Sequence, residues 1–215
     1  MFAHHARYLW YLVAGASTKP SVRLSESWWD DDYRRGGLDR IEGDRELPRL
    51  LLVAALTRHY APGGAVLDIG CGTGTLVEPL RDCFPGSSLR YTGMDYSAVA
   101  LQAAAARSAR LDDASTDAPA MEFAHADFDE YRPRSIFDAI IFSESLNYAP
   151  DPLRTVLRYT DVMSEAGIVI VSLWRRPSRR RIWKALGGAL QERSRSRVVV
   201  PRRPSWDIVV YEKRA

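Results

Sequence analysis

The sequence predicts an α/β fold built on an open, mostly parallel sheet. Three observations carry this prediction. Short apolar runs rich in β-forming residues alternate with helical patterns from Ala65 to Trp174, a glycine-rich turn follows the first run, and two closely spaced strand patterns end the chain. Strands that alternate with helices are typical of βαβ units. With 215 residues and 46% hydrophobic content, the chain fits one domain with a normal core.

The central elements follow one another without an internal repeat. A helix with an apolar face is expected at about 44–60, and the breaker cluster Ala61-Pro62-Gly63-Gly64 ends it. Strands are expected at 65–69, 89–94, 122–126, 137–142 and 167–173, and further helices at 75–83, at 98–110 and from 153 to near Gly167. A polar loop is expected at 112–119. The run at 137–142 is continuously apolar, which is typical of a strand buried on both faces.

The C-terminal part predicts a change of strand direction. A basic helix is expected around 182–186, followed by strands at 198–200 and 206–211. The connection at 201–204 contains proline and is too short for a helical crossover, so these two strands are expected to form a hairpin. The open sheet should therefore end in an antiparallel strand.

Residues 1–43 are expected to form an N-terminal helical lid segment on a globular domain at 44–215. The apolar stretch at 8–13 follows Arg7 and has two interpretations: a short covering helix, which we favour, or the core of a secretory signal. It is too short to span a membrane. Two cysteines, Cys71 and Cys83, do not suffice for a disulfide framework or a four-cysteine zinc site. We therefore expect a cytoplasmic protein.

Positive charge is concentrated near the C-terminus. The net charge is +3, but residues 175–203 contain eleven Lys or Arg and one acid, Glu192, so the remainder carries −7. This asymmetry indicates an anionic substrate, an acidic partner or nucleic acid. A solvated arginine-rich surface is the alternative explanation.

The glycine-rich turn predicts a nucleotide-type ligand. A strand leads into Gly70-x-Gly72-x-Gly74, and a helix follows. Glycines there let the backbone approach a ligand, and the helix offers unpaired N–H groups. The spacing differs from the G-x-G-x-x-G of dinucleotide sites, which disfavours a nicotinamide oxidoreductase. Asp95, at the end of the second strand, is placed to accept hydrogen bonds from two ribose hydroxyls.

The segment Val66-Leu67-Asp68-Ile69-Gly70-Cys71-Gly72-Thr73-Gly74 resembles motif I of the class I S-adenosylmethionine-dependent methyltransferases. The resemblance extends over about 65–174 and is of the small bacterial type-11 or type-12 kind. It implies a Rossmann-like three-layer sandwich, with a seven-stranded sheet whose C-terminal strand is antiparallel. It also implies S-adenosylmethionine as the cofactor and S-adenosylhomocysteine as its product.

The resemblance implies roles for single residues. Gly70 and Gly72 would approach the methionine part of the cofactor, Asp95 the ribose, and Asp127, with Phe128 beside it, the adenine amino group. Asp127 has a simpler alternative explanation, because aspartate is common in surface turns. The full set of expected cofactor-binding residues is Asp68, Gly70, Cys71, Gly72, Gly74, Asp95, Tyr96, Asp127, Phe128 and Ser143.

The segment at 143–148 occupies the place where this family meets its methyl acceptor. Metal-assisted O-methyltransferases of ubiquinone biosynthesis are similar there but carry Glu-x-x-Glu-His, whereas this chain has Glu144, Asn147 and Tyr148 in those places. We therefore expect no catalytic metal. Glu144 or Tyr148 would take the proton of a hydroxyl acceptor, and for an amine a carboxylate would orient the nucleophile. Alternatively, Glu144 only braces the cofactor loop or the N-terminal segment.

An aromatic cluster at 27–33 completes the predicted site. In similar enzymes the N-terminal segment folds over the cofactor and closes the acceptor pocket, so Trp29 and Tyr33, together with Asn147, are candidates for substrate contact. A hydrophobic anchor for a surface helix explains the two tryptophans equally well.

The favoured function is metal-independent methylation of an oxygen or nitrogen atom in a small biosynthetic acceptor, with anionic molecules among the candidates. A nucleic-acid or protein methyltransferase that uses the arginine-rich C-terminal third is the alternative. The Asn-Pro-Pro-Tyr signature of nucleic-acid amine methyltransferases is absent, so we do not expect nucleic acid to be the partner. A non-catalytic cofactor-binding protein is the third interpretation. The acceptor and the oligomeric state have no readable sequence signal.

Overall fold

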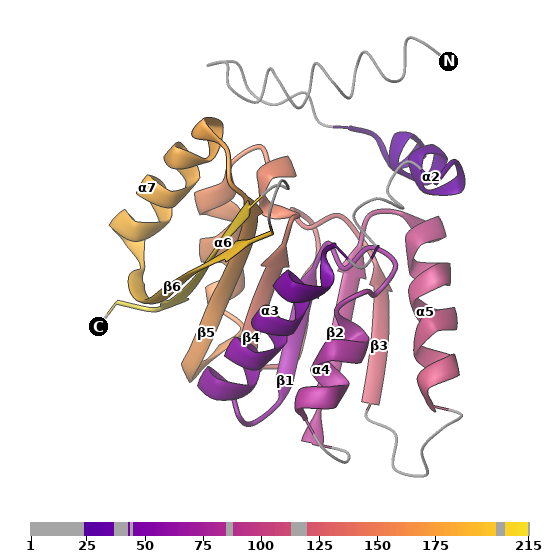
Figure 1. Ribbon diagram of the computed structural model, residues 1–215, viewed down its shortest axis with the longest axis horizontal. Coiled ribbons are helices and arrows are strands. Elements are labelled where there is room, and N and C mark those ends of the chain that lie inside the picture. The colour runs from indigo at the N-terminus through magenta and orange to yellow at the C-terminus, as the bar shows by residue number, and fades with distance from the viewer. Residues whose placement is uncertain are drawn as a thin grey trace.

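The computed structural model describes residues 24–36, 43, 45–84, 88–112, 120–200 and 205–214. Its centre is a seven-stranded sheet of order β3-β2-β1-β4-β5-β7-β6 (Figure 1). The strands are β1 (Ala65–Ile69), β2 (Arg90–Asp95), β3 (Ala120–His125), β4 (Phe137–Ser143), β5 (Met163–Trp174), β6 (Gln191–Val199) and β7 (Ser205–Glu212). The helices are α2 (Glu26–Arg34), α3 (Leu47–Tyr60), α4 (Val77–Cys83), α5 (Ala98–Asp112), α6 (Pro152–Thr160) and α7 (Arg180–Ala189), with short 3₁₀ turns at Leu146–Tyr148 and Pro177–Arg179.

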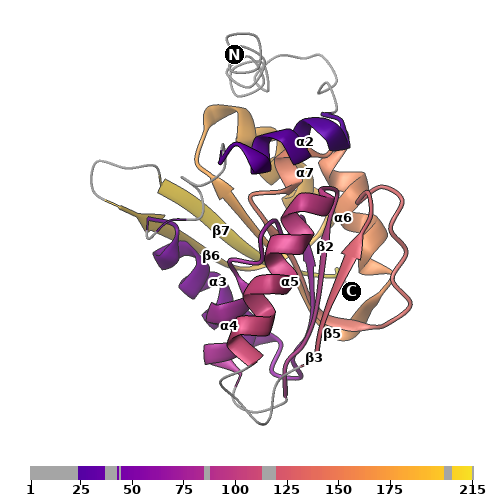
Figure 2. The same cartoon turned by 90° about the vertical axis from the view of Figure 1, so that its right-hand side faces the viewer.

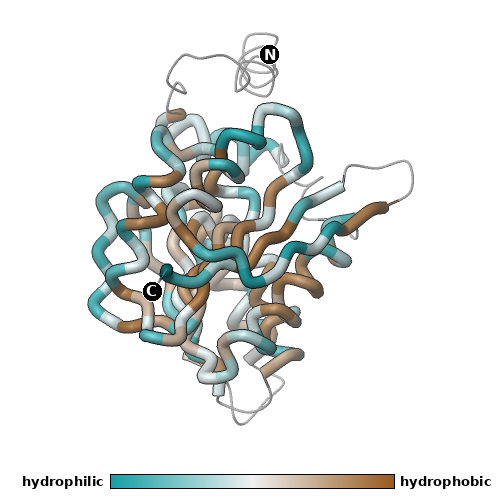
Figure 3. The backbone as a smooth tube through the Cα atoms, turned by 90° about the vertical axis from the view of Figure 1, so that its left-hand side faces the viewer, coloured by the Kyte–Doolittle hydropathy of each residue, from teal (hydrophilic) through white to brown (hydrophobic). Residues whose placement is uncertain are grey.

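The sheet lies between two layers of helices, which confirms the predicted sandwich (Figures 1 and 2). Alternate residues of a strand point to opposite faces. Val66 and Ile141 pack with α3 and α4, whereas their neighbours Leu67 and Ile140 pack on the side of α6 and α7. Figure 3 shows hydrophobic segments in the middle of the molecule and hydrophilic ones along outer turns. The two halves of the core thus share one sheet, whose continuous apolar strands are buried on both faces.

The direction of the strands agrees with the prediction. β1 to β5 run parallel, and β7 is antiparallel to both β5 and β6. The expected strand at 198–200 was too short, because β6 begins at Gln191. In β6, exposed arginines at 193, 195 and 197 alternate with half-buried serines at 194 and 196. This period of two is typical of a strand. In the sequence these residues were interpreted only as part of a run of positive charge, so the strand was missed.

The boundary between α6 and β5 was also predicted wrongly. The helix ends at Thr160 and the strand begins at Met163, so Gly167 lies inside β5. Phe137 pairs with Met163, but Ala139 pairs with Ile168, which leaves a bulge between them. A Cβ on Gly167 would lie 2.4 Å from the Met163 Cγ, so this bulge requires glycine. The other elements overlap the expected ranges.

The lid segment expected at 1–43 is described at 24–36 and 43 only. There, α2 lies over the carboxyl ends of the strands, next to the start of α5 (Figure 1). The apolar stretch at 8–13, most of the expected loop at 112–119 and the connection at 201–204 lie outside the described residues. No helix within the described ranges is long and apolar enough to cross a membrane. The domain boundary at residue 43 stays a prediction.

Candidate functional site

The glycine turn between β1 and α4 is a tight backbone loop. The amides of Gly70 and Cys71 donate to the Met94 carbonyl of β2 at 2.7 and 3.0 Å. Gly70, Gly72 and Gly74 have φ angles of 75°, 56° and 74°, which other residues rarely adopt. A Cβ would also collide with neighbours, at 2.5 Å from a side chain at Gly70 and 3.1 Å at Gly74. The turn therefore packs against its neighbours more closely than residues with a Cβ would allow.

Asp95 ends β2 beside this turn and is held by backbone donors. Its Oδ2 accepts a hydrogen bond from the Gly72 amide and its Oδ1 one from the Ser97 amide, both at 2.8 Å. Burial raises the pKa of Asp95, and these amide donors act in the opposite direction. Each carboxylate oxygen keeps a second lone pair. The carboxylate is thus fixed in orientation and can still accept hydrogen bonds from the two hydroxyls of a ribose.

Asp68 and Cys71 lie beneath the turn, in the protein interior. The Tyr91 hydroxyl donates to Asp68 Oδ2 at 2.9 Å, while Asp68 Oδ1 has no hydrogen-bond partner among the described residues. Burial raises the pKa of Asp68 to about 7 and that of Cys71 well above its usual range. A Cβ on Gly93 would lie 2.9 Å from Cys71 Sγ and 2.9 Å from the Tyr91 ring, so glycine in β2 makes room for these two side chains.

Asp127 and Phe128 lie in the loop after β3, as predicted. Asp127 is buried, and its Oδ1 accepts a hydrogen bond from the Asp129 amide at 2.7 Å. The Phe128 carbonyl accepts from the Tyr159 hydroxyl of α6 at 2.7 Å. Arg158 of α6 also contacts Asp129. Helix α6 therefore holds this loop in place, and the Asp127 carboxylate belongs to an ordered turn.

Helix α2 joins the glycine turn to the start of α5. Asp30 Oδ1 accepts from the Ser97 hydroxyl at 2.6 Å and from the Val99 amide at 3.4 Å. Tyr33 Oη lies 3.0 Å from the position of a Cβ on Gly72. Tyr96, which directly follows β2, accepts a hydrogen bond at its backbone carbonyl from His125 Nε2 at 3.1 Å. The lid helix thus covers the turn that the sequence assigns to the cofactor.

The same helix reaches the predicted acceptor segment. The Trp29 ring makes an edge-to-face contact with Tyr148, with centroids 4.9 Å apart. Trp28 makes a similar contact with Trp29 at 5.0 Å and is buried. Tyr148 and Asn147 lie in the short 3₁₀ turn after β4. Trp28 therefore serves as the hydrophobic anchor, while Trp29 and Tyr33 lie at the two sides of the predicted site.

Glu144 has an unusual environment at the end of β4. It is the one non-glycine among the described residues with a positive φ, 61°, and its amide donates to the Ser172 carbonyl of β5 at 2.9 Å. Its Oε1 is inaccessible and has no hydrogen-bond partner in the described part of the chain. Burial raises the pKa of Glu144 to about 7, although Arg49 lowers it. Strained residues with perturbed carboxyls are concentrated at functional sites.

Sequence analysis missed a buried ion pair that adjoins Glu144. Glu46 and Arg49, at the start of α3, are both buried, and Arg49 Nε lies 2.7 Å from Glu46 Oε2. Arg49 also donates to the Ser143 hydroxyl, so Ser143 is committed to a protein contact. Only the apolar face of this helix entered the prediction. The acid and base three residues apart on that helix were the available signal.

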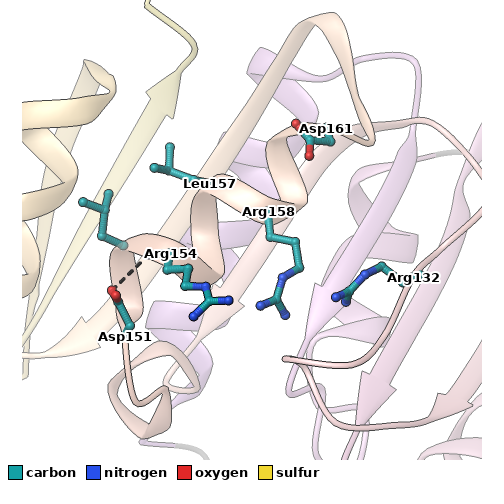
Figure 4. A pocket seen from close by; sticks show the side chains of 7 residues that line it. Arg132, Asp151, Arg154, Leu157, Arg158 and Asp161 are labelled. Atoms are coloured by element: carbon teal, nitrogen blue, oxygen red, sulfur yellow. Dashed lines mark hydrogen bonds between the residues drawn. The ribbon is translucent and has the colours of Figure 1, made fainter. Parts of the chain in front are cut away.

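A hollow of about 530 Å³ lies elsewhere, on the outer face of α6. Figure 4 shows arginine side chains that extend into it from α6 and the neighbouring loop. Its lining residues are Arg132, Asp151, Leu153, Arg154, Leu157, Arg158 and Asp161. None of them is a predicted site residue. In the described ranges no group of three or more His, Cys, Asp or Glu side chains could hold a metal ion.

Comparisons with known proteins agree with this geometry. The family model described as a methyltransferase domain matches residues 67–169. The ubiquinone biosynthesis O-methyltransferase of Rhodopseudomonas palustris (strain TIE-1) is 28% identical over 174 residues. That match covers 78% of this chain and 63% of the relative, so the chain spans less than two thirds of the relative's length.

Solved structures share the fold. Magnesium protoporphyrin IX methyltransferase from Synechocystis PCC 6803, with bound S-adenosylmethionine, superposes with a TM-score of 0.65 at 18% identity, covering 89% of this chain and 99% of that one. The N-methyltransferase NodS from Bradyrhizobium japonicum WM9, with S-adenosylhomocysteine, gives 0.58 at 19% identity, covering 94% and 96%. At such identities the likeness concerns the fold.

Proposed function

We propose that this chain, which belongs to the class I S-adenosylmethionine-dependent methyltransferases, moves the cofactor's methyl group to an oxygen or nitrogen atom of a small molecule. The observation that carries the proposal is the hydrogen bond between the glycine turn and Asp95. The Gly72 amide donates to the carboxylate that would accept hydrogen bonds from the ribose hydroxyls. One hydrogen bond thus links two parts of the predicted cofactor site.

The residues present fit this cofactor. Gly70 and Gly72 have positive φ angles and leave no room for a Cβ beside Ser145 and Tyr33, so only glycine permits this turn. Gly70 and Gly72 would hold the methionine part, Asp95 the ribose hydroxyls, and Asp127 with Phe128 the adenine. When bound, S-adenosylmethionine supplies a methyl group on a positively charged sulfur, which a lone pair can displace. Binding and orientation are then the main tasks of the protein.

Glu144 is the residue that we assign to the acceptor's proton. A hydroxyl that gains a methyl group must lose its proton, and a base with a pKa near 7 is suited to accept it at neutral pH. Arg49 and Arg179 lower the pKa of Glu144 and so oppose the effect of burial. The carboxyl can therefore lose its proton at neutral pH. For an amine acceptor, the same carboxylate would orient the nucleophile. Tyr148 has an aromatic contact with Trp29 and is assigned to the wall of the pocket.

Helix α2 is assigned to water exclusion. Trp29 and Tyr33 project from one helix toward the acceptor segment and the glycine turn, respectively. Closing both sides with one element leaves a drier site, where charged groups interact more strongly.

The arrangement of the basic residues favours a small acceptor over nucleic acid. The exposed arginines of β6 lie against acidic side chains instead of forming an unneutralised patch. Their pairs are Arg193 with Glu212, Arg195 with Glu192 and Arg197 with Asp207. A phosphate-binding footprint needs basic groups that are available for the nucleic-acid backbone.

Calorimetric titration tests the cofactor assignment. S-adenosylmethionine and S-adenosylhomocysteine are titrated into the wild type, Asp95→Asn and the surface control Asp161→Asn. We expect binding to the wild type and the control, and binding weaker by about 10- to 100-fold in Asp95→Asn, because hydrogen bonds to a charged acceptor are worth about 1.5–3 kcal/mol. Thermal melts verify that each variant folds. A wild type that binds neither ligand would overturn the proposal.

A further inference from the structure

Several arginines of the basic stretch after β5 are paired with acids. They are the three arginines of β6 and Arg175, the first one after β5. The pairs are Arg175 and Arg197 with Asp207, Arg193 with Glu212, and Arg195 with Glu192. Surface ion pairing is a sufficient explanation for these arginines.

Arg176 differs from them. Its guanidinium carbon lies 3.8 Å from the centroid of the Trp174 ring, so the planar cation is stacked on an aromatic face. No acidic side chain pairs with it in the part of the chain that the structure describes. Its Nε is out of contact with water and has no hydrogen-bond acceptor among the described residues. An N–H group left in that state costs free energy that a suitable acceptor would recover.

The tryptophan on which Arg176 is stacked lies next to the predicted acceptor segment. Strands β4 and β5 pair in register at Ser143 and Ser172, and the Glu144 amide donates to the Ser172 carbonyl at 2.9 Å. The backbone N–H of Trp174, two residues further along β5, acts on the Glu144 carboxylate. The tryptophan that supports the Arg176 guanidinium therefore contacts Glu144 through its backbone.

We infer that the methyl acceptor carries an oxyanion group, a carboxylate or a phosphate, and that Arg176 binds this group at the carboxyl end of β5. The inference rests on the proposed function. A guanidinium presents a planar fork of donors that matches either oxyanion, and stacking on Trp174 fixes the orientation of the fork in advance. The acceptor would then be held by its acidic group, with its nucleophilic atom directed toward Glu144.

The arrangement separates binding from chemistry. Glu144 needs a neighbouring cation to be a carboxylate at neutral pH, and an anionic acceptor on its own would oppose that ionisation. Arg176 neutralises the acidic group of the acceptor before it reaches Glu144. A neutral analogue would leave the Arg176 guanidinium unpaired, so the site would discriminate against it.

Simple anions test the inference without knowledge of the true acceptor. Benzoate, phenyl phosphate and the neutral isostere benzamide are titrated into the wild type, Arg176→Gln and the matched control Arg197→Gln, with and without saturating S-adenosylhomocysteine. The indole N–H resonances of the six tryptophans are followed by NMR, and that of Trp174 is assigned with Trp174→Phe. Arg197 is a suitable control because it belongs to the same stretch and is paired with Asp207.

We expect at least one anion to shift the Trp174 resonance in the wild type and in Arg197→Gln. Its dissociation constant should rise at least tenfold in Arg176→Gln, and benzamide should cause no shift. If only one anion binds, that result supports the inference and distinguishes carboxylate from phosphate. Equal binding of benzamide, no binding of either anion, or no change in Arg176→Gln would overturn it. Failure of S-adenosylhomocysteine to bind would instead count against the proposed function, and the titration without it still tests Arg176.

Discussion

Replacement of Glu144 with glutamine should stabilise the protein at alkaline pH. Glu144 is a buried carboxyl whose Oε1 has no hydrogen-bond partner in the described part of the chain, and burial raises its pKa from 4.5 to about 7. The folded protein thus binds this proton more tightly than the unfolded chain does. The corresponding stability is fully present below pH 4.5 and is lost as the pH rises through 7. Glutamine has the same shape and no charge to desolvate.

The size of the effect follows from the two pKa values. Each unit corresponds to about 1.4 kcal/mol, so the charged wild type gives up at most about 3 kcal/mol above pH 7. Glu144→Gln should recover up to that amount at pH 8.5, whereas at pH 5 the gain should fall to about 1 kcal/mol or less. For a chain of this length, 1 kcal/mol shifts the melting temperature by about 2–4 °C, which predicts a gain of roughly 6–12 °C at pH 8.5.

Thermal and urea unfolding at pH 5, 7 and 8.5 measure this difference. Asp161→Asn removes an exposed carboxylate and is the control, with an expected change within about 0.5 kcal/mol at every pH. Once an acceptor is known, the wild-type rate should rise with pH through about 7, and Glu144→Gln should lose about 10²- to 10⁴-fold. A variant that is no more stable than the wild type at pH 8.5, or equally stabilised at all three pH values, would refute the assignment of a buried, destabilised carboxylate.

Two further changes test the frame of the site. Gly70→Ala combines a φ of 75° with a Cβ 2.5 Å from a neighbouring side chain, and should cost about 2–4 kcal/mol and weaken S-adenosylhomocysteine binding in calorimetry. Gly188→Ala, in α7 with open space around it, should be neutral or stabilising by about 0.5–1 kcal/mol; equal melting temperatures for the two variants would contradict this. Asp30→Ala removes the hydrogen bond between α2 and Ser97, so it should lower the free energy of unfolding by about 1 kcal/mol and weaken cofactor binding several-fold. Asp31→Ala removes only surface ion pairs and should change neither quantity. Identical binding by both aspartate variants would show that the docking of α2 is unimportant.

The sequence predicted the fold well where one periodicity dominates. The first four strands have ordinary lengths and lie between glycine, proline or polar breakers, and each was placed to within two residues. The start of β5 was missed because Val156, Thr160 and Met163 continue a helical spacing past the real end of α6. What ends the helix is the pairing of Met163 with Phe137 in β4. Such tertiary pairing overrides local pattern and leaves no local signal.

The two halves of the candidate site differed in how far they could be predicted. The glycine turn and Asp95 lie in short contiguous segments, and their roles depend on backbone geometry that only glycine permits. The acceptor half that we propose combines side chains from α3, from the end of β4 and from the segment after β5. Arg49 donates to Ser143, which lies 94 positions away in the sequence. Arg176 was singled out only because its guanidinium is stacked on the Trp174 ring. A sequence pattern cannot supply contacts of that separation.

Asp68 and Glu144 show why a raised pKa is insufficient to identify a base. Burial raises the pKa of both to about 7, and each has one oxygen without a hydrogen-bond partner in the described ranges. Asp68 lies within β1 at 1% exposure and accepts a hydrogen bond from the Tyr91 hydroxyl, so no substrate can approach it without breaking the sheet. Glu144 follows the end of β4 and has a φ of 61°, a strained conformation for a non-glycine residue. Equal desolvation therefore does not distinguish the two carboxyls, and our assignment of the base to Glu144 rests on its place after β4, in the proposed acceptor segment.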